Sequence, residues 1–143
     1  MKFGNPSREE IRALLERSRT IAVVGLSDDP ARPSHGVTRV MQRFGYRIVP
    51  VNPELEQWEG LPAYPDLASA VSGSAEPIDI VNVFRRPARV GTVVDECLRL
   101  SLPALWLQVG VVNEEAAARA VAAGMTVVMD RCIKVDRMAM SDR

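Results

Sequence analysis

The sequence predicts a doubly wound α/β domain of three layers, in which helices cover both faces of a mostly parallel sheet. Short β-prone apolar runs alternate with segments whose apolar residues recur at helical spacing, and short turns join them. This alternation is typical of parallel sheets assembled from strand–helix–strand units. The length of 143 residues suffices for one hydrophobic core and is short for two ordinary enzyme domains. We therefore expect residues 1–143 to form a single domain.

The chain is predicted to start with a helix that precedes the first strand. Ser7 and Glu10 have the spacing of a capping box, so a helix is expected within residues 1–19. Its apolar residues form one stripe, which must be buried against the sheet or against a neighbouring molecule. The continuous apolar run over residues 20–24 then predicts a strand covered on both faces. This strand opens a core that is expected to span residues 20–135.

The alternation of strands and helices continues to the end of this core. Further strands are predicted over residues 46–51, 78–84, 104–107 and 126–129. Further helices are predicted over residues 37–44, 66–71, 87–98 and 113–123. Residues 58–63 are predicted to form either a short strand or an irregular crossover.

Individual residues mark where these elements begin and end. Gly45 stands where a left-handed C-cap follows a helix. Asp66 and Asn113 can each cap the start of a helix, and Pro87 is favoured in a first helical turn. The nitrogen of Pro50 carries no hydrogen, so the ladder of the second strand is expected to end near it.

Composition and charge argue against several function classes. Eighteen basic residues balance 18 acidic ones, so no surplus of positive charge favours nucleic-acid binding. No apolar run approaches the roughly 20 residues of a membrane-spanning helix, and the first residues lack the apolar core of a secretion signal. We therefore expect a cytoplasmic location and neither nucleic acid nor a membrane as partner. Cys97 and Cys132 lie in different elements without a CxxC spacing, so neither zinc nor a redox pair is expected.

The first strand ends in a turn suited to phosphate. In a doubly wound sheet, ligands bind at the carboxyl ends of the strands where the strand order reverses. Here Gly25 would let backbone approach a ligand, the hydroxyl and amide of Ser27 could donate to an oxygen, and Arg32 supplies charge. The helix that follows offers unpaired amides at its start. Alternatively, the segment is a plain turn in which Ser34 caps the helix.

Two features at the first two strand ends depart from the pattern of NAD-binding domains. The dinucleotide fingerprint GxGxxG has three glycines, whereas only Gly25 is present here. After the second strand, Asn52 and Pro53 stand where such domains place an Asp or Glu for the ribose hydroxyls. Asn52 could hydrogen-bond a ligand without repelling a phosphate. Together, the two departures argue against NAD.

Polar residues also follow two later strands. Phe84, Arg85 and Arg86 bring an aromatic ring and two guanidiniums to the expected ligand edge, where they suit base stacking and polyphosphate binding. Alternatively, the arginines are an ordinary solvated pair. Gln108 and Gly110 place a side-chain amide and a glycine beside the same site, so both are candidates for ligand contact.

The sequence shows no complete catalytic set. Group transfer needs an activated nucleophile or a positioned acid and base. The single histidine, His35, lies near the expected phosphate site and could contact a ligand, but no Ser-His-Asp or Cys-His arrangement can be built around it. Asp130, Arg131 and Cys132 form one further polar cluster, interpreted as an ion pair that closes the sheet beside a small buried thiol. Binding without catalysis is therefore favoured.

Five phrases of the sequence, taken together and in order, resemble the small stand-alone CoA-binding protein family. They occupy residues 21–27, 49–53, 79–86, 106–111 and 130–132, and the likeness covers residues 20–135. The fold of this family is similar to the CoA-binding domain of the succinyl-CoA synthetase alpha subunit. The resemblance implies a Rossmann-like domain that holds coenzyme A or an acyl-CoA. The synthetases carry their phosphorylated histidine on a further domain, so the resemblance implies no catalytic role here.

The resemblance also implies which positions contact the ligand. These are Gly25, Ser27, Arg32, Asn52, Pro53, Phe84, Arg85, Arg86, Gln108 and Gly110, with His35 added as a position at which family members vary. Two alternatives stay open. One is an enzyme that acts on a CoA thioester or a nucleotide through Cys132 or His35, and the other is an NAD(P)- or nucleotide-sensing module that regulates a partner. A homodimer or an unknown protein partner also stays open.

Overall fold

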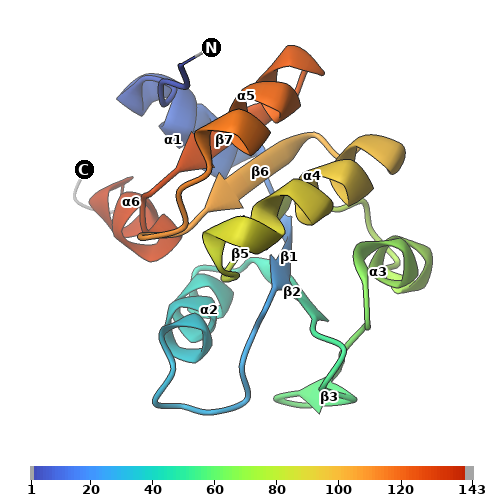
Figure 1. Ribbon diagram of the computed structural model, residues 1–143. Coiled ribbons are helices and arrows are strands. Elements are labelled where there is room, and N and C mark those ends of the chain that lie inside the picture. The colour runs from blue at the N-terminus through green and yellow to red at the C-terminus, as the bar shows by residue number, and fades with distance from the viewer. Residues whose placement is uncertain (1, 141–143) are drawn as a thin grey trace.

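The computed structural model describes residues 2–140, which form a five-stranded parallel sheet between two layers of helices (Figure 1). The strands are β1 (Thr20–Val24), β2 (Arg47–Val51), β5 (Ile80–Val83), β6 (Ala104–Leu107) and β7 (Thr126–Met129). They lie in the order β2-β1-β5-β6-β7, so the strand order reverses between β1 and β5. This arrangement confirms the predicted doubly wound, three-layer fold.

Three helices cover each face of the sheet (Figure 1). One face carries α1 (Arg8–Arg17), α2 (Pro33–Arg43) and α6 (Ile133–Met140), and the other carries α3 (Leu67–Gly73), α4 (Val90–Arg99) and α5 (Glu114–Ala122). Successive strand residues point to opposite faces, and Ile21 and Val23 therefore pack with the first set of helices while Ala22 and Val24 pack with the second. Within the described part of the chain, none of the helices has the length and apolar character needed to cross a membrane.

The amino-terminal helix α1 packs on its own sheet. The Glu10 amide donates to the Ser7 hydroxyl over 3.1 Å, and the Ser7 amide donates to the Glu10 carboxylate over 3.1 Å, which confirms the capping box. The predicted stripe of Ile11, Leu14 and Leu15 is buried in the core beside β1. Burial of such side chains contributes roughly 1.5–3 kcal/mol each. The stripe therefore meets the sheet of the same molecule.

The segment after β2 that was predicted as a short strand or an irregular crossover forms a small hairpin. Its strands β3 (Gln57–Trp58) and β4 (Leu61–Pro62) pair antiparallel outside the main sheet. Glu59 and Gly60 join them with φ values of 48° and 83°, as two-residue hairpin turns require. Trp58 is buried, and its indole nitrogen donates to the carbonyl of Ser27 over 2.9 Å. The hairpin thereby holds the loop that follows β1.

The helix α6 lies beyond the elements that the sequence predicts. Ile133 is its fully buried side chain, whereas Val135 and Met138 are 57% and 48% exposed. No apolar stripe therefore marks this helix in the sequence. It contacts α1 and α2, and its first residue, Ile133, donates to the side chain of Gln108 just after β6.

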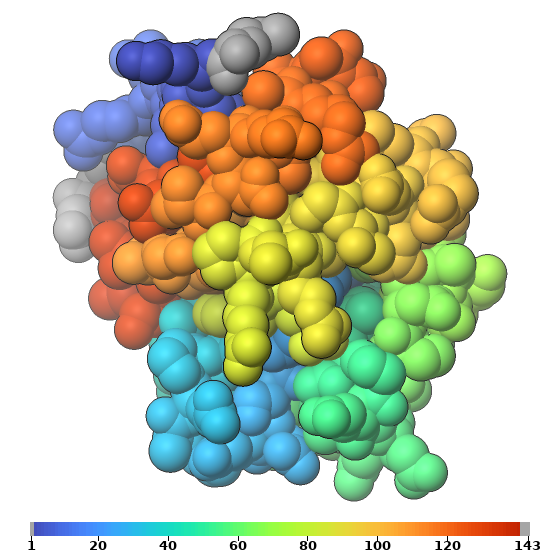
Figure 2. Space-filling view, viewed as in Figure 1, coloured from blue at the N-terminus to red at the C-terminus, as the bar shows by residue number. Residues whose placement is uncertain are grey.

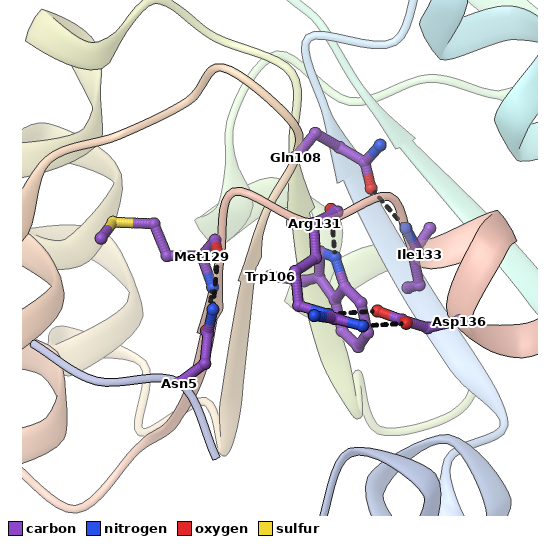
Figure 3. Close-up of polar contacts among 7 residues, drawn as sticks. All are labelled: Asn5, Trp106, Gln108, Met129, Arg131, Ile133 and Asp136. Carbon is purple, nitrogen blue, oxygen red and sulfur yellow. Dashed lines mark hydrogen bonds and ion pairs between the residues drawn. The ribbon is translucent and has the colours of Figure 1, made fainter. Parts of the chain in front are cut away.

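Each outer strand of the sheet has a partner at the carboxyl end of its free edge. Along β7, the side-chain amide of Asn5 donates to the Met129 carbonyl over 2.9 Å and accepts from the Met129 amide over 2.8 Å (Figure 3). Along β2, the Tyr64 amide donates to the Pro50 carbonyl over 2.9 Å, and the Asn52 amide donates to the Tyr64 carbonyl over 2.9 Å. Pro50 is tolerated because β2 is an edge strand.

Candidate functional site

A cavity of about 850 Å³ lies at the carboxyl ends of the strands, at the reversal of strand order. Figure 2 shows the segment after β5, drawn in yellow, projecting above the blue loop after β1 at this hollow. Its lining includes eight of the predicted positions: Gly25, Ser27, Arg32, Asn52, Phe84, Arg85, Arg86 and Gln108. It also includes Cys132, the reactive group of the enzyme alternative. Five uncharged residues in the lining were not predicted as contacts: Pro33, Ser34, Val37, Val109 and Val111.

Gly25 lets the loop after β1 meet the segment after β5. Its φ is 83°, a conformation that favours glycine. A Cβ at this position would collide with the carbonyl oxygen of Phe84, and it would lie 3.3 Å from Cδ of Arg85. The Gly25 amide also donates to the Val51 carbonyl over 2.9 Å. A glycine is therefore required here by backbone contact, and the cavity floor depends on it.

The loop after β1 uses most of its polar groups internally. The Ser27 amide donates to the Ser34 hydroxyl over 2.9 Å, and the Ser27 hydroxyl accepts from the Asp29 amide over 3.0 Å. The Ser27 hydroxyl hydrogen has no acceptor among the described residues, whereas the Ser27 amide is engaged. Helix α2 begins after Arg32, without a side-chain cap. The start of α2 therefore keeps the partial positive charge that attracts anions.

Three guanidiniums at the cavity have no partner among the described residues. The side chains of Arg32, Arg85 and Arg86 make no hydrogen bond or ion pair there, although all three line the cavity. Two carboxylates, Asp29 and Glu54, also line it, so the charged lining carries three positive and two negative groups. Unpaired arginine forks suit planar or tetrahedral oxyanions.

The second strand end contributes less than the sequence predicts. The Asn52 side chain donates to the Leu26 carbonyl over 3.0 Å and accepts from the Glu54 amide over 2.9 Å. Asn52 therefore shapes the cavity wall while both ends of its side chain are engaged. Pro53 is exposed and does not line the cavity.

Gln108 is held rigidly at the end of β6. Its side-chain oxygen accepts from the Ile133 amide over 2.9 Å (Figure 3) and from the Asn82 side-chain nitrogen over 3.1 Å. Asn82 lies inside β5 and is missed by the sequence predictions. The signal that could have found it is a single polar residue in an apolar strand, because a buried polar side chain must be hydrogen-bonded.

Gly110 and His35 lie outside the cavity lining. The Gly110 amide donates to the Asp130 carboxylate over 2.8 Å, and φ of Gly110 is 83°. His35 is buried, with its ring 5.2 Å from the ring of Trp58 and its Nε2 3.7 Å from a carboxylate oxygen of Glu59. Helix α2 thus turns His35 toward the β3–β4 hairpin.

Arg131, which follows β7, pairs with Asp136 and not with its neighbour in the sequence, Asp130. Arg131 donates two hydrogen bonds to Asp136, over 2.8 and 2.6 Å (Figure 3), and this contact raises the pKa of Arg131. Asp130 is instead in the left-handed region, with φ of 62°. Cys132 is half-buried and lines the cavity. Residues 2–140 contain no group of three or more His, Cys, Asp or Glu side chains placed to hold a metal ion.

Known proteins match nearly the whole chain. A family model described as a CoA binding domain matches residues 19–138. YneT of Bacillus subtilis (strain 168) is 50% identical over 131 residues, which are 92% of this chain and 94% of that protein. The structure of ID.343 from Thermus thermophilus is 37% identical with a TM-score of 0.86, covering 94% of this chain and 99% of that one. A protein from Pyrococcus horikoshii OT3 is 29% identical with a TM-score of 0.87, covering 99% of both chains.

Proposed function

Because this chain belongs to the CoA-binding domain family, we propose that it binds coenzyme A or an acyl-CoA in the cavity, without catalysing a reaction itself. The observation that carries the proposal is the group of three unpaired guanidiniums, Arg32, Arg85 and Arg86. Coenzyme A carries a diphosphate and a ribose phosphate, and each is a partner for an arginine fork. When bound, coenzyme A supplies a thiol that carries acyl groups.

The shape of the cavity also fits such a ligand. Its volume of about 850 Å³ lies within the range of small-molecule sites. Gly25 has no side chain to keep a phosphate from the backbone, and α2 begins with its positive end at the cavity. Val37, Phe84 and Val109 provide apolar wall for the uncharged pantetheine arm. Charged and apolar lining thus occur together, as the two parts of coenzyme A require.

Calorimetric titration with coenzyme A tests the proposal. The wild-type protein should give saturable heat, and Arg85→Ala with Arg86→Ala should weaken binding about a hundredfold, since a charge-assisted contact contributes roughly 1.5–3 kcal/mol. The matched control is Arg99→Ala, an exposed arginine in the last turn of α4 that does not line the cavity. This control should bind like the wild type. Absence of saturable heat from the wild type would overturn the proposal, as would undiminished affinity in the double variant.

A catalytic alternative is supported by one observation, the presence of Cys132 in the lining of the same cavity. Incubating the protein with acetyl-CoA and measuring free CoA thiol tests it. Under the binding proposal, thiol release stays at the rate of buffer alone. Release that is faster with the wild type and lost in Cys132→Ala would instead establish an enzyme acting on CoA thioesters.

A nucleotide-sensing alternative predicts a different ligand order. A ligand that binds only the folded state raises the melting temperature according to its affinity. At equal concentrations, coenzyme A should therefore raise the melting temperature more than NADH or NADPH. The reverse order would favour the sensing module.

A further inference from the structure

The Gln108 side chain has one fixed orientation. Its oxygen accepts from two donors, Nδ2 of Asn82 over 3.1 Å and the amide of Ile133 over 2.9 Å. Rotating the amide by half a turn would place its own N–H groups against these two donors. The hydrogen bonds from Asn82 and Ile133 are both buried, so the rotated amide would leave their N–H groups unpaired away from water. The oxygen is thereby fixed inward, and the nitrogen is turned away from Ile133 (Figure 3).

The Gln108 nitrogen is an unused donor at the cavity. It has no hydrogen-bond acceptor among the described residues. In residues 2–140, the one fully buried side-chain nitrogen or oxygen without a partner is the Thr38 hydroxyl. The Gln108 nitrogen is therefore open to solvent, and the cavity is the space that Gln108 lines.

The surroundings of this donor favour an uncharged acceptor. Val109, Val111 and Cys132 line the cavity beside the end of β6, and none of them carries a fixed charge. The three free guanidiniums follow β5 and precede α2 instead. A neutral N–H donor in this uncharged part of the lining matches a carbonyl oxygen better than a phosphate.

We propose that Nε2 of Gln108 donates to a carbonyl oxygen of the uncharged arm of the bound CoA ligand, and that Asn82 is its positioning residue. This inference rests on the proposed function. Two carbonyl sources share this chemistry, the amides of the pantetheine arm and the thioester of an acyl-CoA. If the thioester is the acceptor, the protein selects acyl-CoA over free coenzyme A.

The test measures dissociation constants of four probes by calorimetry. The probes are acetyl-CoA, S-ethyl-CoA, which lacks the thioester carbonyl, coenzyme A, and adenosine 3′,5′-bisphosphate, which lacks the pantetheine arm. Gln108→Glu keeps an acceptor for Asn82 and Ile133 but removes the donor. Gln108→Met removes the donor without adding charge. The melting temperature of each variant verifies that it is folded.

We expect both variants to weaken binding of an arm-containing ligand about fivefold relative to adenosine 3′,5′-bisphosphate, the size of one net hydrogen bond. Weakening of acetyl-CoA alone identifies the thioester carbonyl as acceptor, and equal weakening of all three CoA ligands identifies a pantetheine amide. Equal weakening of all four probes, or of none, overturns the inference and leaves the proposed function standing. If the wild type binds no CoA ligand, both fail.

Asn82 gives a second test, because it does not line the cavity. Asn82→Asp places a carboxylate beside the Gln108 oxygen, which favours the rotated amide and turns the donor away from the ligand. Binding of the arm-containing ligand should weaken about fivefold relative to binding of adenosine 3′,5′-bisphosphate, so the ratio of the bisphosphate's dissociation constant to that of the arm-containing ligand should fall about fivefold. Adding Asn82→Asp to Gln108→Met should not change this ratio further. A further decrease in that double variant would overturn the positioning role.

Discussion

Two regions at the carboxyl edge of the sheet differ in whether their polar groups have hydrogen-bond partners within the chain. In the open region, after β1 and β5, the guanidiniums of Arg32, Arg85 and Arg86 have no partner among the described residues. In the closed region, which consists of Gly110 and residues 130, 131 and 136, Gly110 donates to Asp130 and Arg131 pairs with Asp136. Both regions look alike in the sequence, because each is a short polar phrase after a buried strand. The two regions therefore differ in free hydrogen-bonding capacity and not in polarity, and the open region is the one that we propose as the ligand site.

The largest expected difference is in the reactivity of the two cysteine thiols. Burial, followed by the neighbouring Glu96 charge, raises the pKa of the Cys97 thiol to about 12. At pH 8 its thiolate is about a thousandfold scarcer than that of an ordinary thiol. Iodoacetamide should therefore label Cys132 at the cavity and leave Cys97 unlabelled, as peptide mass spectrometry can measure. Cys132→Ser should abolish labelling, whereas modification of Cys97 in the folded protein would contradict its burial.

Gly25, which joins the two strand ends of the open region, should affect stability more than a glycine in an ordinary turn. We expect Gly25→Ala to lower the free energy of unfolding by about 3 kcal/mol, because positive φ and the collision with the Phe84 carbonyl both act. Gly60→Ala is the matched control, since its φ is also 83° but no atom lies near the added Cβ. It should cost about 1 kcal/mol. Urea unfolding measures both, and equal losses would show that the collision is relieved at little cost.

Replacing an arginine of the closed region should change stability, whereas replacing an arginine of the open region should change binding. Arg131→Ala should lower the free energy of unfolding by about 1 kcal/mol, after solvent screening of a side chain that is 41% exposed, and leave coenzyme A affinity unchanged. Arg86→Ala should leave the free energy of unfolding within about 0.5 kcal/mol of the wild type and weaken binding about tenfold. Urea unfolding and calorimetry measure the two effects. An affinity loss in Arg131→Ala would break the distinction between the regions.

The smallest effect is expected at an element that belongs to neither region, the amino-terminal cap of α3. The backbone amide and then the hydroxyl of Ser69 donate to Asp66 and lower its pKa below the ordinary 3.8. The stabilisation is therefore present above the unfolded pKa and is lost as pH falls through the lower folded value. Asp66→Ala should cost about 1 kcal/mol at neutral pH, and the difference should shrink toward pH 2. Urea unfolding across this pH range should show a difference that changes, and a constant one would contradict the cap.

Local signals predict much of the fold because they depend on neighbouring residues. The strands at 104–107 and 126–129 have the predicted bounds, and Ser7, Asp66 and Asn113 cap helices as predicted. The missed helix α6 has one fully buried side chain, Ile133, so its formation depends on contacts with α1 and α2. Such contacts leave no periodic pattern in the sequence.

The site is predicted in outline for a related reason. Topology places strand ends together, so the sequence predicts which loops form the cavity. Whether a polar group there is free depends on partners that are distant in sequence. The Ser27 amide is taken by Ser34, and the rotation of α2 turns His35 to Trp58. Local sequence patterns do not predict these pairings.

The edges of the sheet bear on how copies of this chain meet. An exposed edge strand is a template onto which another molecule can add its own strand, and chains of such additions lead to aggregates. Here one asparagine side chain, Asn5, stands in for a peptide unit beside Met129, and the backbone of Tyr64 does the same beside Pro50. The carboxyl end of each outer strand thus already has a neighbour from its own chain. Two single residues occupy the carboxyl ends of the two outer strands, where another molecule would otherwise find a free peptide group.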